Sequence, residues 1–281
     1  RQRMHARIAE ALEKETESKV HLQELARHSM EGKLGAKAVW YALSLASQAR
    51  MEFSHEIAVR CFEYVLDERI GMSGDDLCRV SIDAADTMLA LGLPKRAMRR
   101  LKDEMEVTRR IGRDLKGRMY MQMALSCQHQ GDFVGQEFYC RKGLQLFRGV
   151  PLSEKNLTRA MLYAELALRS AVQSHPRRGL QYLKKAMDSC PDTGSEVLSG
   201  RIQSIAAFLH RVACDLKPSL LASRKAESIL SRTDEYYLSC SAYSTHGFIL
   251  MSLGRFAKAL EKHKQAVQMS DKSRSVIPRA Q

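Results

Sequence analysis

A pattern of small and aromatic residues recurs about every forty residues along this chain, and it limits the folds that the chain can adopt. The clearest copy lies near the C-terminus, where Tyr243 and Gly247 precede a turn at Gly254 and where Ala259 and Ala266 follow it. Small residues at these spacings let two antiparallel helices approach closely, so each copy predicts one helical hairpin. The equivalent upstream turns, at intervals of 41, 39, 43, 40 and 40 residues up to Gly254, are Met51, Gly92, Gly131, Ser174 and Cys214.

Each copy also has a small residue seven positions before its turn, and four copies have an aromatic residue four positions earlier still. The small residues are Ser44, Ala85, Ala124, Ala167, Ala207 and Gly247. The aromatic residues are Trp40, Tyr120, Tyr163 and Tyr243. The pattern resembles the tetratricopeptide repeat (TPR) family in a long-helix form, because the usual unit has about 34 residues. The resemblance covers residues 34–271 and implies a right-handed superhelical solenoid of about six antiparallel helix pairs.

The composition favours an all-α fold. Hydrophobic residues make up 44% of the chain, prolines number only six, and no alternating Val, Ile and Thr runs predict a sheet. Helices are predicted at residues 2–15, 19–31, 35–50, 54–69, 74–91, 94–111, 114–130, 132–148, 154–173, 176–189, 195–214, 218–231, 234–253 and 255–271. The first copy fits the pattern only with a small shift in its second helix. The fifth copy, with Gln203, Leu216 and Ser219, is the most divergent.

The first 33 residues are interpreted as an N-terminal helical cap or as a linker from an upstream domain. Parts of this region and the start of the first repeat, residues 5–13, 24–28 and 35–38, resemble the passage between the ATPase core and the helical repeats of STAND-type signalling ATPases. The alternative is a simple capping helix pair packed through Ile8, Leu12, Leu22 and Leu25. Because the chain begins with Arg, we expect a piece of a longer protein, and we expect the basic tail at 272–281 to be flexible.

The sequence predicts a cytoplasmic location. No apolar stretch reaches the roughly twenty residues that cross a bilayer, and no secretory signal is present. The seven cysteines are odd in number and scattered, and none forms a Cys-x-x-Cys pair, so we expect buried reduced thiols.

No catalytic motif is found, and we predict a protein that is not an enzyme and needs no cofactor or metal. Phosphate-binding loops, His-Glu-x-x-His and Gly-x-Ser-x-Gly are missing from the sequence. His21 and His28 lie two helical turns apart, too far to share a metal, so they are interpreted as helix-interface residues. The spaced glycine pairs at 32–35 and 71–74 are interpreted as hairpin connections.

The family resemblance implies where a partner binds, because the first helix of each TPR pair lines a concave groove. The predicted groove residues are Tyr41, Arg79, Asp86, Arg118, Met121, Gln128, Arg201, Ser204, Phe208, Arg211, Ser244 and Phe248. Arginines next to apolar groups suit a protein or peptide with acidic and apolar side chains. The alternative is that groove arginines are solvated or pair internally, for example Arg79 with Asp86. The form of the family that grips a chaperone's C-terminus needs Lys and Asn at matching positions, and Asn is absent there.

The net charge of +13 raises a second possibility. Ten basic residues lie between Lys95 and Arg118, and only four acidic residues lie in the same stretch. Such a stripe suits phosphate contacts with nucleic acid. It lacks interleaved aromatic residues for base stacking, however, so we favour a solvated face or an acidic protein partner.

Two functions from different classes therefore follow from the sequence. The first is a non-catalytic scaffold for proteins, peptides or ligands, the sensing or interaction module of a larger bacterial signalling or regulatory protein. The alternatives are a nucleic-acid-associated repeat protein that uses the stripe at 95–118, or the peptide-sensing module of a transcription regulator. Self-association through the terminal repeats is also expected to be possible, because open-ended solenoids expose their last helix. A peptide, a folded domain and a small molecule all remain candidate ligands.

Overall fold

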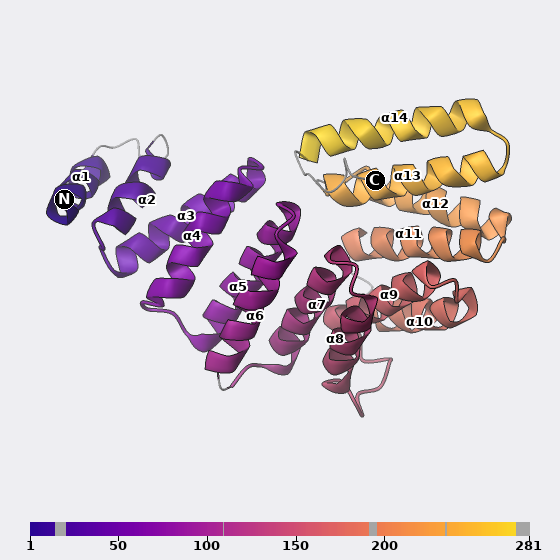
Figure 1. Ribbon diagram of the computed structural model, residues 1–281, viewed down its shortest axis with the longest axis horizontal. Coiled ribbons are helices and arrows are strands. Elements are labelled where there is room, and N and C mark those ends of the chain that lie inside the picture. The colour runs from indigo at the N-terminus through magenta and orange to yellow at the C-terminus, as the bar shows by residue number, and fades with distance from the viewer. Residues whose placement is uncertain (15–20, 109, 191–195, 234, 274–281) are drawn as a thin grey trace. The chain divides into compact units, whose positions relative to one another are not determined.

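The computed structural model of the protein describes residues 1–14, 21–108, 110–190, 196–233 and 235–273, and in these residues the regular structure is entirely helical (Figure 1). The helices in the described residues are α1 (Gln2–Lys14), α2 (Leu22–Glu31), α3 (Ala36–Met51), α4 (His55–Glu68), α5 (Gly74–Ala90), α6 (Pro94–Val107), α7 (Arg113–His129), α8 (Phe133–Gln145), α9 (Leu157–Val172), α10 (Pro176–Ser189), α11 (Glu196–Val212), α12 (Leu216–Leu230), α13 (Tyr236–Ser252) and α14 (Phe256–Ser273). The all-α prediction is confirmed. Most of the predicted tail lies outside the described residues.

The chain divides into two compact units, Arg1–Leu115 and Lys116–Gln281. In the N-terminal unit each helix from α1 to α6 packs against the next one along the chain. In the C-terminal unit α8 to α14 do the same, and α7 packs on α8 and α9 through an apolar cluster around Met121, Cys140 and Leu162. Successive packed helices are what a solenoid of helical hairpins requires, so the predicted pairing is confirmed.

The turns inside the pairs confirm five of the six predicted turn positions. Gly92, Gly131 and Gly254 have positive φ angles of 71°, 72° and 71°, and Ser174 and Cys214 have φ angles of 58° and 60°. In all five pairs the chain therefore passes through the left-handed region between the two helices. Glycine adopts this region without steric cost, whereas Ser and Cys do so at a cost.

The first predicted turn, Met51, is wrong by two residues. Met51 is the last residue of α3, and the positive φ angle, 57°, belongs to Phe53. The shift also moves the small packing position from Ser44 to Ala46, which is fully buried. Trp40 is 62% exposed and is not the packed aromatic that the repeat pattern predicted. An aromatic and a small residue four apart matched the pattern here by coincidence.

Among the helix boundaries that differ from the prediction, two have clear local reasons. α6 ends at Val107 rather than residue 111, because the backbone of Thr108 is extended. α12 begins at Leu216, two residues earlier than predicted. Its Pro218 lies in the first turn, where a missing backbone N–H costs nothing because no carbonyl inside the helix would accept it.

The pairs of the C-terminal unit pack closely because some interface positions have no side chain. A Cβ atom on Gly179 of α10 would lie 2.3 Å from Cδ2 of Leu209 in α11 and 3.2 Å from the carbonyl oxygen of Ala167 in α9. A Cβ atom here would force the end of the Leu209 side chain to move and would press on the Ala167 carbonyl, so glycine favours this close three-helix contact. The small residues of the repeat pattern thus act as predicted in this pair.

The cysteines match the prediction in most positions but not in all. All seven are free, and five of them are buried. Burial raises the pKa of the Cys61 and Cys78 thiols to about 11, which keeps both protonated and unreactive at neutral pH. Cys214 is exposed and corrects the expectation of a buried thiol, because it occupies the tight turn between α11 and α12.

Candidate functional site

The first helices of successive pairs lie next to each other in the C-terminal unit. Helix α11 contacts both α9 and α13 directly. Half of the predicted groove residues lie on α11 and α13. We call the face that they belong to the first-helix surface, and its predicted members are Arg201, Ser204, Phe208, Arg211, Ser244 and Phe248.

The contact between α11 and α13 places a cation between two aromatic rings. The guanidinium carbon of Arg211 lies 5.1 Å from the centroid of the Phe208 ring and 6.0 Å from that of the Phe248 ring. Phe248 is 46% exposed, and on its other side it meets the ring of His263 edge-on at 5.0 Å. The Nε atom of Arg211 is buried and has no hydrogen-bond partner, and no described carboxylate lies within ion-pairing distance of the side chain. This half of the surface therefore presents a positive charge that remains available.

The contact between α11 and α9 is different, because its arginine is already occupied. Arg201 pairs with Glu165 of α9, whose side chain is only 2% exposed. Gln136 of α8 donates a second, longer hydrogen bond to the same carboxylate, at 3.5 Å. The alternative that groove arginines pair internally therefore holds for Arg201. A buried carboxylate needs this cation, so Arg201 is not available to a ligand.

Two serines complete the predicted set on α11 and α13. The Ser204 hydroxyl donates to the carbonyl oxygen of Gly200 one turn earlier, at 3.2 Å, so its proton is used inside the helix. Ser244 is half-buried on α13. Of the four predicted groove residues on α11, Arg201 and Ser204 donate to groups within the protein, whereas Phe208 and Arg211 contact each other.

The predicted residues on α7 do not form one surface. Arg118 is exposed, but Met121 is 5% exposed and packs in the core with Cys140 and Leu162. Gln128 accepts a hydrogen bond from Nε2 of Gln136 in α8, at 3.4 Å. Met121 is therefore a correction, because it fills the space between α7, α8 and α9 instead of a binding surface.

In the N-terminal unit the predicted residues have local partners. The Tyr41 hydroxyl donates to Glu13 of α1 at 2.9 Å, so it holds the first helix pair against α3. Asp86 pairs with Arg50 of the preceding pair at 3.1 Å instead of with Arg79, which is exposed. The internal pair given as an example of the alternative, Arg79 with Asp86, does not form, because the preceding helix pair supplies the cation.

Two exposed apolar residues on the first helix of the first repeat were not among the predicted groove residues. With the turn at Phe53, Trp40 and Met51 lie thirteen and two residues before the turn, on the first helix of the pair. Both are exposed, at 62% and 77%, and Trp40 packs edge-on against Tyr41 at 4.8 Å. The small residue Ala46, seven positions before Phe53, is the sequence signal that could have revealed the shift.

The basic stripe is partly neutralised from a neighbouring helix. Arg96 of α6 pairs with Glu63 of α4, and Arg100 pairs with Asp67 of α4 at 2.6 Å. The sequence reading counted only the acidic residues inside the stripe, and these partners lie 33 residues earlier. The surplus charge on α6 is therefore smaller than predicted, which weakens the case for phosphate binding.

Other chemical sites were sought in the described residues. Across the part of the chain whose side chains are described, no three His, Cys, Asp or Glu residues come together as metal ligands would. Nor does any described helix combine the length and the apolar character that a membrane crossing requires. Two buried histidines also meet, with Nδ1 of His5 in α1 lying 2.7 Å from Nδ1 of His28 in α2 and with Glu31 at 2.9 Å from His5. This cluster holds the terminal helix pair together.

Three of the solved structures with similar folds have TM-scores between 0.57 and 0.59. PlcR of Bacillus thuringiensis, in complex with the peptide PapR7 and DNA, is 13% identical with a TM-score of 0.59, and the match covers 89% of this chain and 85% of that one. A Rap protein complexed with Competence and Sporulation Factor is 17% identical with a TM-score of 0.58, over 85% and 68% of the two chains.

The third is a STAND protein from Pyrococcus horikoshii with a tetratricopeptide repeat sensor. It is 15% identical with a TM-score of 0.57, and the match covers 92% of this chain but 41% of that one. No family model and no curated protein matches the sequence. At these identities the likeness shows a shared fold, that of TPR-type helical repeats.

Proposed function

We propose that this chain, whose fold is that of TPR-type helical repeats, is a non-catalytic scaffold that binds a peptide or protein segment on the first-helix surface. The bound segment presents an acidic side chain with an apolar side chain beside it. The observation that carries this proposal is Arg211, a cation between two aromatic rings with no carboxylate partner among the described residues.

The chemistry of the surface supports such a ligand. Stacking against Phe208 and Phe248 limits the rotamers of Arg211, so little further entropy is lost when a carboxylate binds. A charge-assisted contact of this kind contributes about 1.5–3 kcal/mol, which corresponds to about 10- to 150-fold in affinity. The exposed Phe248 ring and the nearly half-exposed Met251 side chain suit the apolar neighbour.

Within this proposal the chain is the sensing or interaction module of a larger signalling or regulatory protein. The STAND protein with its TPR sensor supports this, since this chain matches only 41% of it. PlcR, solved with the peptide PapR7 and DNA, supports a peptide ligand and keeps a transcription regulator as the alternative setting. The Rap protein, solved with Competence and Sporulation Factor, supports a bound partner.

The proposal is tested with a peptide array that contains Asp or Glu next to Leu or Phe, together with matched Asn and Gln versions. The wild-type protein should prefer the acidic versions, and the affinity of its best peptide should fall at least tenfold in Arg211→Met. Arg224→Met is the matched control, because Arg224 is exposed on the second helix α12. Equal binding by wild type and Arg211→Met would overturn the proposal.

The second candidate, nucleic-acid binding by α6, retains some support from two exposed cations. Arg99 and Lys102 are exposed and have no ion-pair partner among the described residues. The double variant Arg99→Glu with Lys102→Glu should abolish salt-sensitive retention of single- or double-stranded DNA if this function is real. Under our proposal neither wild type nor variant retains nucleic acid at physiological salt, and peptide binding is unchanged.

A further inference from the structure

A cavity of about 570 Å³ lies in the C-terminal unit among α8, α9, α10 and the segment that joins α8 to α9. It is separate from the first-helix surface and shares no residue with it. Its described lining contains four cations and no Asp or Glu, and the cations are Arg141, Arg148, Arg159 and Lys185. Ligand cavities in proteins commonly measure about 300–1,000 Å³, so a small organic molecule fits this volume.

The most unusual of these cations is Arg159, which is only 2% exposed. Its guanidinium donates to the backbone carbonyls of Val150 and Pro151 at 3.0 Å each, to that of Leu152 at 3.3 Å, and to that of Glu154. These carbonyls satisfy hydrogen bonds but carry no net charge, and no described carboxylate pairs with the side chain. The Nε atom has no partner at all. A buried charge without a counter-ion is costly, so the cavity wall favours an anion.

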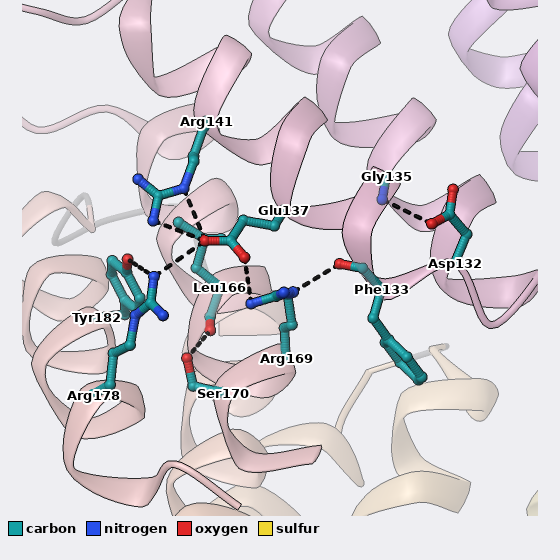
Figure 2. A network of polar contacts seen from close by, with 10 residues as sticks. All are labelled: Asp132, Phe133, Gly135, Glu137, Arg141, Leu166, Arg169, Ser170, Arg178 and Tyr182. Atoms are coloured by element: carbon teal, nitrogen blue, oxygen red, sulfur yellow. Dashed lines mark hydrogen bonds and ion pairs between the residues drawn. The ribbon is translucent and has the colours of Figure 1, made fainter. Parts of the chain in front are cut away.

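Next to the cavity, three arginines surround the single carboxylate of Glu137, which leaves a second surplus of positive charge. Figure 2 shows the guanidinium groups of Arg141, Arg169 and Arg178 converging on this single carboxylate, at 2.7, 2.6 and 3.1 Å. Burial by itself raises the pKa of Glu137, but the hydrogen bond from Arg141 and the charges of the three arginines outweigh it and hold the pKa below its usual value. One negative charge therefore partly neutralises three positive charges. Arg141, which also lines the cavity, keeps part of its charge for a ligand.

The cavity also presents aromatic rings. Tyr163 of α9 and Tyr182 of α10 both line it, and their rings are nearly parallel, with centroids 6.4 Å apart and an interplanar angle of 25°. The Lys185 ammonium lies 5.8 Å from the centroid of the Tyr163 ring, and the Arg178 guanidinium lies 5.6 Å from that of Tyr182. Cations next to partly exposed tyrosine rings suit a molecule that is charged at one end and planar at the other.

We propose that this cavity binds a small phosphorylated compound with a planar ring, of the mononucleotide class. The phosphate dianion interacts with Arg141, Arg148 and Lys185, and the positive field of the buried Arg159 stabilises it. The planar ring packs against Tyr163 and Tyr182. A dianion suits the site better than a single carboxylate, because the cations around the cavity exceed the nearby carboxylate by more than one charge.

The test is isothermal titration calorimetry of the full chain with AMP and GMP, and with adenosine and inorganic phosphate as partial ligands. A mononucleotide should bind at least tenfold more tightly than either partial ligand, because only the whole molecule uses both the cations and the rings. O-phosphotyrosine tests the other source of a ring phosphate, a modified peptide side chain.

Charge-reversal variants locate the site without changing buried residues. Lys185→Glu and Arg148→Glu should each weaken mononucleotide binding at least tenfold, whereas Lys184→Glu, on the neighbouring exposed position of α10, should change it less than twofold. Circular dichroism confirms that each variant is folded. Arg211→Met should bind the mononucleotide normally, which separates this site from the peptide surface.

Three results would each overturn the inference. The first is no mononucleotide binding at about 1 mM. The second is an equal loss of binding in Lys184→Glu and Lys185→Glu. The third is binding of O-phosphotyrosine with no response to AMP or GMP, which would assign the cavity to a phosphorylated peptide instead.

Discussion

The two contacts that α11 makes with its neighbouring first helices use the same residue type in opposite ways. Towards α9, Arg201 pairs with the buried Glu165, and the ion pair is complete within the protein. Towards α13, Arg211 stacks against Phe208 and Phe248 and has no described carboxylate partner. Two arginines on one helix therefore have different roles. The difference comes from the neighbouring helix, which supplies a carboxylate in one contact and an aromatic ring in the other.

The largest expected effect comes from breaking the ion pair between Arg201 and Glu165. Arg201→Met should lower the free energy of unfolding by about 3–5 kcal/mol, because it leaves the 2% exposed Glu165 without its counter-ion. Urea denaturation measures the loss. The double variant Arg201→Met with Glu165→Gln removes both charges and should recover most of the stability. If Arg201→Met alone costs under about 1 kcal/mol, the two contacts of α11 do not differ as described.

A second complete cluster, Glu227 of α12 with His246 of α13 and Lys262 of α14, gives a pH-dependent test. Burial by itself raises the pKa of Glu227, but the hydrogen bonds from His246 and Lys262 outweigh it and hold the pKa below its ordinary value of 4.5. The stability from this depressed pKa is present above about pH 4.5 and is lost as the pH falls through the folded-state pKa.

We therefore expect Glu227→Gln to lower the free energy of unfolding by about 2 kcal/mol at pH 7 and to have much less effect near pH 3. Chemical denaturation at the two pH values measures the difference. Glu261→Gln, at an exposed carboxylate on α14, is the control and should have little effect at either pH. An equal loss for Glu227→Gln at both pH values would show that the carboxylate acts through packing and not through its charge.

A change in the turn after α11 should alter the stability of the protein without altering peptide binding. Cys214 has a φ angle of 60°, so Cys214→Gly should raise the free energy of unfolding by about 0.5–1 kcal/mol because glycine adopts this conformation without steric cost. Cys214→Ala keeps the steric cost and is the control. Thermal unfolding measures both variants. Peptide binding should stay the same in each, since the turn lies outside the first-helix surface.

The smallest effect on stability is expected at the available arginine. Arg211→Met should change the free energy of unfolding by under about 0.5 kcal/mol, because methionine keeps the packing against the rings and no carboxylate loses its partner. Differential scanning calorimetry beside Arg201→Met makes the contrast direct. Similar losses in the two variants would show that Arg211 is as structural as Arg201.

Much of the fold could be predicted because its signals are local. The turn glycines Gly92, Gly131 and Gly254 and the small residues before them predicted where each hairpin bends, and the helix boundaries mostly agree within two or three residues. The first turn was placed two residues too early, because Trp40 and Ser44 have residue types and a spacing that fit a turn at Met51 instead of Phe53. Only the packing reveals that Trp40 is exposed and that Ala46 is the buried small residue.

The candidate site was less predictable, because its chemistry depends on residues far away in the sequence. The partner of Arg201 lies 36 residues earlier, and that of Asp86 also lies 36 residues earlier. The repeat position of Met121 predicted an exposed groove residue, but its side chain is only 5% exposed and lies in the core. The repeat pattern assigns a position within a helix, and it does not say which side chain of the preceding pair will meet it.

The amino-acid sequence by itself determined that this chain is a series of helical hairpins with turns about forty residues apart, because helix periodicity, small packing residues and turn glycines act over short distances. Only the tertiary structure decided which charges are available. The packing of neighbouring helices brings Glu165 next to Arg201 and places Arg211 between aromatic rings. The segment before α9 surrounds Arg159 with carbonyl oxygens. The reason is that the energy of a charge depends on its burial and on its nearest partner, and neighbouring helix pairs determine both.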